Sequence, residues 1–167
     1  MTQPPFRIGP ARTVADFETA ARLFERYAAS LGIDLAYQGF AEELATLPGS
    51  YAPPAGALLL AHCIDGEPLG CVALRPMAPA DCPVGGCCEM KRLYVLPRGR
   101  GIGLGRALVD AILAEAVRVG YREMRLDTLP TLTEAIALYR KAGFTPIAAY
   151  YDTPVPGTIF LGRSLAG

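Results

Sequence analysis

Residues 89–106 read EMKRLYVLPRGRGIGLGR, and this stretch decides how the chain is expected to fold. Its first part, through Leu96, mixes aliphatic and aromatic residues and stops at Pro97, which is typical of a strand. Its second part is rich in glycine and leads straight into a helical pattern that ends at Gly120. Free N–H groups and the helix dipole make such a helix N-terminus a site for phosphate. The stretch therefore predicts a strand, a turn and a helix that together bind an anionic, phosphorylated ligand.

Two other phosphate-binding motifs fit the glycine-rich turn less well. A GxGxxG dinucleotide fingerprint would need glycine where Leu104 or Arg106 stands, although Asp127 follows at about the distance of a ribose-binding acid. A P-loop would need Gly-Lys-Ser or Gly-Lys-Thr, which the sequence lacks. A dinucleotide-dependent oxidoreductase is therefore disfavoured. A glycine-rich turn without any ligand is the plain alternative.

Length and composition fit one globular domain over residues 1–167, since 51% of the residues are hydrophobic and 19% are charged. The 16 Lys and Arg balance the 16 Asp and Glu, which argues against general nucleic-acid binding and against binding to a membrane surface. No apolar stretch is long enough to span a bilayer and no signal-peptide pattern opens the chain, so a cytoplasmic location is expected. The balance hides one uneven segment, because five cations and no acid lie between Lys91 and Arg106. We expect these cations to surround the anion site.

The cysteines do not indicate a metal site. None of the five forms a CxxC pair, and the only histidine, His62, lies in an apolar run that looks like a strand. We therefore expect no metal, and interpret as core residues or surface thiols Cys63, Cys71, Cys82, Cys87 and Cys88.

Hydrophobic periodicity and turn signals predict the other elements. A first helix is indicated by a stripe of helical spacing made of Val14, Phe17, Ala21, Phe24 and Ala28. A shorter helix is expected over 40–47, and Thr131 and Glu134 have the spacing of a capping box that opens a last helix, ending at Gly143. The other strands are expected at Phe6–Ile8, Leu58–Ile64, Leu69–Leu74, Met124–Leu126, Pro146–Tyr151 and Thr158–Leu161, with an Asp65-Gly66 turn joining the second and third. This order indicates a mixed α/β (α+β) fold.

Two motifs resemble those of the GNAT superfamily of acyl-CoA-dependent N-acetyltransferases. Arg100-Gly-Ile-Gly-Leu-Gly105 matches the family's [QR]-x-x-G-x-[GA] pyrophosphate loop. Ala135-Ile-Ala-Leu-Tyr139-Arg-Lys-Ala-Gly143-Phe144 matches its A-x-x-x-Y-x-x-x-G-F helix. The resemblance implies a central twisted mixed sheet of about six or seven strands, flanked by about four helices, whose fourth and fifth strands splay apart.

The resemblance also implies how acetyl-CoA would be held. The pyrophosphate would lie on the amides of Arg100, Gly101, Ile102, Gly103, Leu104, Gly105 and Arg106. The exposed backbone around Leu93, Tyr94 and Val95 would pair with pantetheine, and the Leu93 N–H would point at the thioester carbonyl as the oxyanion donor. The Asn that many members place three residues before Ala135 is Leu132 here, which leaves that cofactor contact to Thr131 or another group.

Two side chains match the family's catalytic positions. Glu89, at the start of the fourth strand, would be the general base that takes a proton from the amine, directly or through water. Its structural alternative is an ion pair with Lys91, which lies on the same strand face. Tyr139 would be the general acid that protonates the CoA thiolate, and its alternative is a core aromatic on the stripe of Ala135 and Ile136.

The activity implied is transfer of an acetyl group from acetyl-CoA to a primary amine by direct attack in a ternary complex. The expected partners are acetyl-CoA and a small amine or a peptide N-terminus, and a homodimer is left open. The acceptor would lie among loop residues that include Tyr37, Tyr51, Asp127, Tyr150, Tyr151 and Asp152. The alternative from another class is a non-catalytic module that binds or senses CoA.

Overall fold

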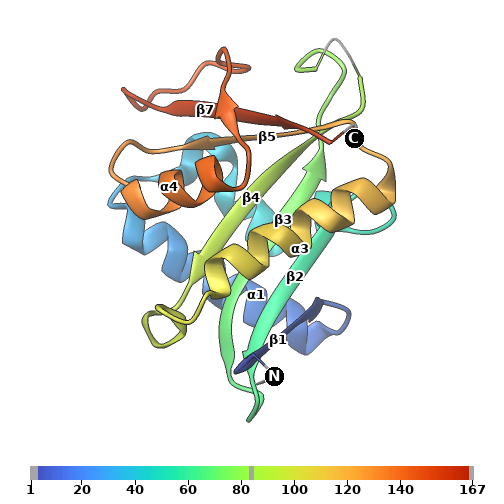
Figure 1. Ribbon diagram of the computed structural model, residues 1–167, viewed down its shortest axis with the longest axis vertical. Helices are drawn as coiled ribbons and strands as arrows, with labels where there is room; N and C mark the ends of the chain where they lie inside the picture. Colours follow the sequence, from blue (N-terminus) through green and yellow to red (C-terminus); the bar gives the residue numbers. More distant parts are fainter. Residues whose placement is uncertain (1–3, 83–84, 166–167) are drawn as a thin grey trace.

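The computed structural model describes residues 4–82 and 85–165, which fold around one mixed sheet (Figure 1). The strand order is β1-β2-β3-β4-β5-β7-β6. The strands are β1 (Phe6–Pro10), β2 (Ala57–Cys63), β3 (Pro68–Pro76), β4 (Cys87–Val95), β5 (Glu123–Thr128), β6 (Thr145–Pro146) and β7 (Ile159–Ser164). Neighbouring strands are antiparallel except for β4 and β5, which are parallel because α3 connects them across the sheet.

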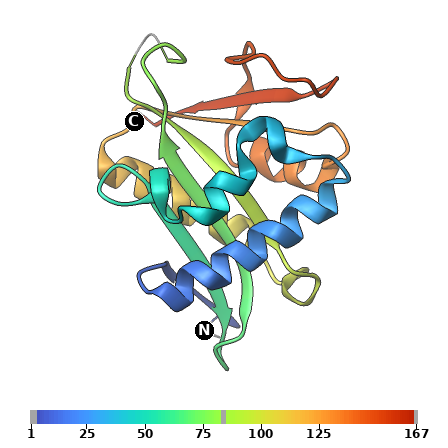
Figure 2. The ribbon, with the colours of Figure 1, turned by 180° about the vertical axis from the view of Figure 1, so that it is seen from behind.

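Helices cover both faces of this sheet. They are α1 (Val14–Leu31), α2 (Phe40–Ala45), α3 (Leu104–Val119) and α4 (Thr133–Lys141). Figures 1 and 2 show α3 and α4 on one face and α1 and α2 on the opposite face. Each face has its own core, since alternate residues of a strand point to opposite sides. On β3, for example, Val72 packs in the α3 core and Ala73 in the α1 core.

Side chains along β4 alternate between the two faces of the sheet, and this alternation is interrupted at one residue. The register with β3 runs from Arg75 opposite Glu89 to Ala73 opposite Lys91, then shifts before Cys71 meets Tyr94. Two residues of β4, Arg92 and Leu93, therefore stand where β3 offers only Val72, which is a β-bulge. Arg92 is the one non-glycine residue with positive φ, 62°, among the described residues. The bulge turns Lys91 and Arg92 to the same side of the sheet, toward α1 and α2, as their contacts below show.

The predicted fold class is confirmed, including the mixed sheet, the four helices and the separation of the fourth and fifth strands. The glycine signals are also confirmed, because α3 begins directly after Gly103 and ends at Gly120 in the left-handed conformation. In the ranges 4–82 and 85–165, no helix is long and apolar enough to cross a membrane.

Four local predictions are wrong. Of the strand predicted over Pro146–Tyr151, only the first residue belongs to β6; the Ile147 N–H still donates to the Phe160 carbonyl oxygen of β7, and the chain then leaves the sheet. The capping box fails because α4 begins at Thr133, with Leu132 as N-cap and no side-chain cap. Val14 is 73% exposed, so the buried stripe of α1 consists of Ala20, Leu23 and Phe24. Cys82 and Cys87 form a disulfide, whereas Cys63, Cys71 and Cys88 are free thiols as expected.

Candidate active site

A gap opens in the sheet between β4 and β5. Their parallel pairing covers only three residue pairs, from Cys87 opposite Glu123 to Glu89 opposite Arg125. Beyond that point β5 turns away from β4, as Figure 1 shows. The half-buried end of β4, which carries Leu93, Tyr94 and Val95, pairs with β3 and faces the gap on its other edge. An extended ligand can add to such an unpaired edge as a further strand.

The N-terminus of α3 lies at the end of the glycine-rich loop that follows β4. Gly101 and Gly103 have φ of 77° and 81°, a backbone conformation that glycine adopts without strain. Gly103 is the N-cap, and no side chain among the described residues caps the first turn of the helix. The N–H groups of that turn are therefore available to an anion, as the sequence predicts. The Arg100 side chain reaches back from this loop, and its Nε donates to the Val95 carbonyl oxygen over 3.2 Å.

Only part of the cationic segment lies at this loop. Arg98, Arg100 and Arg106 are on its exposed side, and Arg106 pairs with Asp110 over 2.9 Å. Lys91 and Arg92 are instead buried beneath α1 and α2, where carboxylates neutralise them. The expectation that all five cations surround the anion site is therefore wrong for these two, because strand alternation points Lys91 to the other face and the bulge turns Arg92 to that face as well.

Glu89 is almost fully buried and both of its carboxylate oxygens have partners. Oε1 pairs with the Arg75 guanidinium over 2.8 Å, and Oε2 accepts a hydrogen bond from the Tyr150 hydroxyl over 2.6 Å. The alternative that Glu89 pairs with Lys91 is not what the structure shows, since Lys91 Nζ bonds to Gln38 and Asp127. Burial, and then the negative charge of Glu89, raises the pKa of Tyr150, so this phenol keeps its proton.

A second carboxylate faces Glu89 across the gap. Asp127 of β5 accepts a hydrogen bond from the Tyr151 hydroxyl over 2.6 Å, and its other oxygen lies 3.6 Å from Lys91 Nζ. The rings of Tyr150 and Tyr151 both pack edge-on against Phe160, at centroid distances of 5.1 and 5.3 Å. Tyr150 and Tyr151 therefore each donate a hydrogen bond to one of the two carboxylates, Glu89 and Asp127. Burial lowers the pKa of Lys91, although Glu89 and Asp127 oppose the shift.

Tyr139 of α4 lines a cavity of about 30 Å³ inside the gap. The cavity wall is completed by Tyr27, Gln38, Met90, Lys91, Arg92, Leu93, Leu126 and Asp127. Burial raises the pKa of Tyr139, so its hydroxyl stays protonated and can act as an acid. The ring also packs edge-on against Phe144, 5.9 Å away, so Tyr139 both contributes to the core and reaches the cavity.

Of the acceptor candidates, Asp127, Tyr150 and Tyr151 gather at the gap, whereas Asp152 is exposed beside it. Tyr37 accepts a hydrogen bond from Gln38 Nε2 over 3.0 Å, next to this cavity. Tyr51 lies elsewhere, in a pocket under α2.

Arg92 forms a clamp on the bulge that the sequence does not indicate. The Arg92 guanidinium donates two hydrogen bonds to Glu43 of α2, over 2.8 and 2.9 Å, and one to Gln38 Oε1 over 2.9 Å. It also lies 5.1 Å from the centroid of the Phe40 ring. These partners are about fifty residues away in the chain, so no local spacing could have indicated them.

Replacing Arg92 with methionine is expected to lower the free energy of unfolding by about 3–5 kcal/mol, because it leaves the Glu43 carboxylate buried and unpaired. Urea denaturation followed by circular dichroism measures the change. Arg118→Met is the matched control, since Arg118 pairs with Glu115 at an exposed site and its loss should leave the midpoint unchanged. Equal destabilisation by the two variants would contradict a special role for the clamp.

No cluster of three or more His, Cys, Asp or Glu that could hold a metal occurs in the described part of the chain.

Comparison with known proteins agrees with this geometry. The model of the Acetyltransferase (GNAT) family matches residues 19–144. An uncharacterised N-acetyltransferase from Schizosaccharomyces pombe is 39% identical over 154 residues, covering 92% of this chain and 91% of that protein. A GNAT-family acetyltransferase from Staphylococcus aureus has the same fold, with a TM-score of 0.76 at 17% identity and coverage of 96% and 99% of the two chains.

A protein from Salmonella typhimurium, solved with its cofactor acetyl-CoA, also shares the fold. Its TM-score is 0.72 at 20% identity, with coverage of 97% of this chain and 95% of that one. The family match spans most of this chain, and the yeast relative matches it almost from end to end. The chain therefore belongs to the acetyltransferase (GNAT) family and is an acyl-CoA-dependent N-acyltransferase.

Proposed function

We propose that the protein transfers an acetyl group from acetyl-CoA to a primary amine by direct attack within a ternary complex. One observation carries the proposal: the β4–β5 gap opens immediately before an uncapped helix N-terminus. An anion at the helix and an extended arm in the gap would therefore belong to one ligand. The fold shared with a protein solved with acetyl-CoA supports this donor.

The loop and the end of β4 have complementary tasks in this proposal. The amides from Arg100 to Arg106 hold the pyrophosphate, aided by the dipole of α3. The backbone of Leu93, Tyr94 and Val95 pairs with the pantetheine arm as an added strand. Bound in this way, acetyl-CoA supplies an activated acetyl thioester beside the cavity that Leu93 and Tyr139 line.

The Leu93 N–H is proposed to stabilise the oxyanion that forms when the amine attacks. Leu93 lies directly after the bulge and lines the cavity, so its amide is on the part of β4 that faces the gap. A backbone donor fixed in a strand needs no reorganisation when charge develops on the carbonyl oxygen. One such contact typically contributes about 2.7–4 kcal/mol to transition-state stabilisation.

Glu89 is proposed to take the proton of the amine through Tyr150. The carboxylate is already bonded to Arg75 and Tyr150, so the Tyr150 hydroxyl is the group that can pass a proton to it over 2.6 Å. In that step the ammonium form of the acceptor gives its extra proton to the Tyr150 oxygen while the Tyr150 hydroxyl proton moves to Glu89, which leaves a neutral amine. The amine nitrogen then forms its bond to the acetyl carbon.

Tyr139 is proposed to complete the reaction as the general acid. When the tetrahedral intermediate collapses, the carbon–sulfur bond breaks and the thiolate needs a proton. The Tyr139 hydroxyl faces the same cavity as Leu93, and burial keeps it protonated. It therefore donates its proton to the sulfur, the acetylated nitrogen loses its extra proton and so restores the Tyr139 hydroxyl, and the products are CoA and an N-acetylated amine.

Gly103→Asp tests the proposed donor site. Aspartate tolerates the positive φ of this position but places a negative charge at the helix N-terminus, so acetyl-CoA affinity is expected to fall about tenfold or more. Thermal-shift titrations with acetyl-CoA, CoA and NAD measure it, because the stabilisation by a ligand grows with the logarithm of its concentration divided by its Kd. The matched control is Gly66→Asp, in the β2–β3 turn, where φ is 88° and an added Cβ also meets open space.

Equal losses of affinity in the two glycine variants would contradict the proposed phosphate loop, and stabilisation by NAD alone would overturn the donor assignment. Turnover is then read as thiol release with a panel of amines. Binding of CoA without turnover on any amine would favour a sensing module over an enzyme that acetylates amines.

A further inference from the structure

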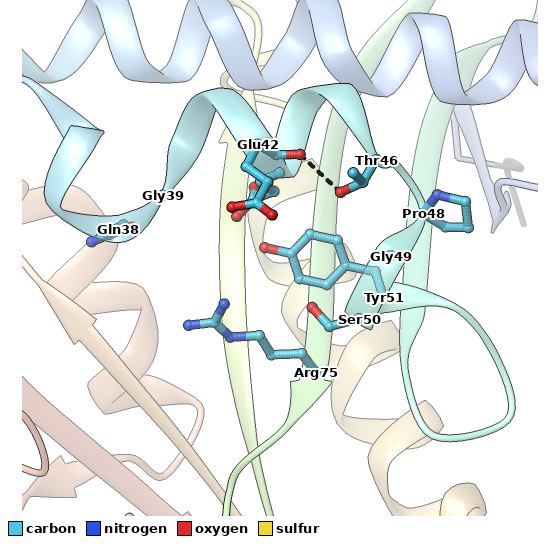
Figure 3. Close-up of a pocket in the computed structure, with 10 residues that line it drawn as sticks. Gln38, Gly39, Glu42, Thr46, Pro48, Gly49, Ser50, Tyr51 and Arg75 are labelled. Carbon is cyan, nitrogen blue, oxygen red and sulfur yellow. Dashed lines mark hydrogen bonds between the residues drawn. The ribbon is translucent and has the colours of Figure 1, made fainter.

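A second pocket lies under α2, on the α1–α2 face of the sheet, with a volume of about 220 Å³ (Figure 3). We call it the side pocket. Its walls consist of Gln38, Gly39, Glu42, Glu43, Thr46, Pro48, Gly49, Ser50, Tyr51 and Arg75. The cavity at Tyr139 holds only about 30 Å³, which is room for an amino group but not for the rest of an acceptor. The remainder of an acceptor therefore needs other space, and the side pocket supplies it.

The side pocket and the cavity at Tyr139 share walls. Gln38 lines both of them, and its amide oxygen accepts hydrogen bonds from Lys91 and Arg92. Arg75 lines the side pocket while its guanidinium pairs with Glu89, the proposed base. A molecule in the side pocket would thus lie close to the proposed reacting groups, with only Gln38 between it and the cavity at Tyr139 and only Arg75 between it and Glu89.

The unpaired charge of the side pocket is negative. Glu43 pairs with Arg92 and Arg75 pairs with Glu89, so two of the three charges in its wall are neutralised. The third is Glu42, and Figure 3 shows its carboxylate pointing into the pocket. No Lys or Arg within residues 4–82 or 85–165 forms an ion pair with it. The pocket is therefore complementary to a cation and repels a carboxylate.

A buried hydroxyl in the side pocket also lacks a partner. Tyr51 is 1% exposed, and its hydroxyl makes no hydrogen bond with the described residues. Figure 3 shows the ring crossing the pocket, with the hydroxyl on the side where the Glu42 carboxylate and the Arg75 guanidinium also lie. Burial, and then the charge of nearby Glu43, raises the pKa of this phenol. A neutral phenol oxygen can accept a hydrogen bond from an ammonium group, which would satisfy it.

We infer that the side pocket binds the second ammonium group of a diamine or polyamine acceptor, on the Glu42 carboxylate and the Tyr51 hydroxyl. This inference rests on the proposed acetyl transfer to an amine. One amino group of the acceptor enters the cavity beside Tyr139 and is acetylated, while the other stays in the side pocket and remains charged. The acceptor class is therefore set by the charge of its far end, not by its reacting end.

The test compares acceptors that differ only at the far end. The probes are α,ω-diaminoalkanes of increasing length and, at each length, the n-alkylamine, the amino-alcohol and the ω-amino acid. The diamine is expected to have about a fivefold higher kcat/KM than the alkylamine at the best length, since a partly exposed ion pair contributes modestly. The ω-amino acid should be the poorest acceptor. Equal kcat/KM values for the diamine and the alkylamine at every length would overturn the inference.

Variants of the side pocket test whether Glu42 and Tyr51 cause the preference for the diamine. Glu42→Gln and Tyr51→Phe should each raise KM for the diamine about fivefold or less, and leave kinetics with the alkylamine unchanged. Glu42→Lys should reverse the order, so that the ω-amino acid becomes a better acceptor than the diamine. Glu18→Gln, an exposed acid on α1 outside the pocket, is the matched control and should change nothing.

The outcomes separate this inference from the proposed function. If alkylamines are acetylated but Glu42→Gln and Glu42→Lys leave the diamine preference as it was, the side pocket does not bind the far end and the inference is wrong. If no amine of the panel is acetylated although acetyl-CoA binds, the proposed function fails first. Urea midpoints near that of the unaltered protein verify that each variant is folded.

Discussion

Tyr139→Phe is expected to lower kcat about 10²- to 10⁴-fold while acetyl-CoA binds with unchanged affinity. The substitution removes only the hydroxyl, which faces the cavity of about 30 Å³, and keeps the ring that packs against Phe144. The thiolate would then have to leave without a proton donor. Burial raises the pKa of Tyr139 above its usual value near 10, so its proton is available throughout the neutral and moderately alkaline range. A stopped-flow measurement of thiol release gives kcat, and calorimetry gives the Kd for acetyl-CoA.

A second phenol in the same cavity provides the control for this variant. Tyr27 lines the cavity beside Tyr139, and burial raises its pKa to about 12. Tyr27→Phe removes a hydroxyl of similar surroundings and should change kcat far less. If both variants lose activity equally, the phenols act by shaping the cavity and Tyr139 is not the specific acid. Unchanged turnover in Tyr139→Phe would remove the role altogether.

Glu89→Gln should reduce kcat/KM about 10²- to 10⁴-fold at neutral pH. Without a base, the reaction depends on the fraction of amine that is already neutral in solution. That fraction rises tenfold per pH unit up to the pKa of an alkylamine, near 10. The deficit of the variant should therefore shrink as pH rises, whereas a purely structural defect would persist at every pH. Glu123→Gln, a carboxylate on the neighbouring strand β5, is the control.

Tyr150→Phe distinguishes proton transfer to Glu89 through the Tyr150 hydroxyl from proton transfer without it. If the proton passes through the Tyr150 hydroxyl, this variant should resemble Glu89→Gln in both the size and the pH dependence of its loss. If kcat/KM changes little, Glu89 works without the phenol and the proposed relay is wrong. The ring itself is held by Phe160, at 5.1 Å, so the substitution should leave the site in place.

Local signals in the sequence predicted those parts of the fold that local chemistry controls. Helix α3 was predictable because a glycine-rich loop precedes it and Gly120 ends it. The last helix shows the limit of such signals. Thr131 and Glu134 have the right spacing for a capping box, but Leu132 N–H bonds to the Leu129 carbonyl in a turn, and the helix begins one residue later than the spacing indicates.

Tyr150 and Tyr151, at the end of a segment predicted to be a strand, show a second limit of local sequence signals. The apolar run from Pro146 to Tyr151 has strand-like composition, yet only its first residue joins a strand of the sheet. Tyr150 and Tyr151 leave it because each hydroxyl reaches a buried carboxylate of β4 or β5. Composition cannot foresee this, since the partners of Glu89 lie 14 and 61 residues away along the chain.

The candidate site divides in the same way. The glycine-rich loop before α3 and the position of Tyr139 on α4 were predictable because each belongs to a short continuous segment. The side pocket was not, since its walls come from α2, the following turn and β3, and its charge depends on which carboxylates are already paired. The roles of Leu93, Glu89 and Tyr139 stay predictions, and the variants above test those of Glu89 and Tyr139.

The bulge at Arg92 adds a residue without disturbing the strand around it. Lys91 still lies opposite Ala73 and Tyr94 still lies opposite Cys71, so each core receives the side chains that a regular strand would give it. A single extra residue therefore distinguishes this β4 from a strand in regular register with β3. The same residue supplies the cation that ties α2 to the sheet, so one position both interrupts the alternation of β4 and fixes α2 against it.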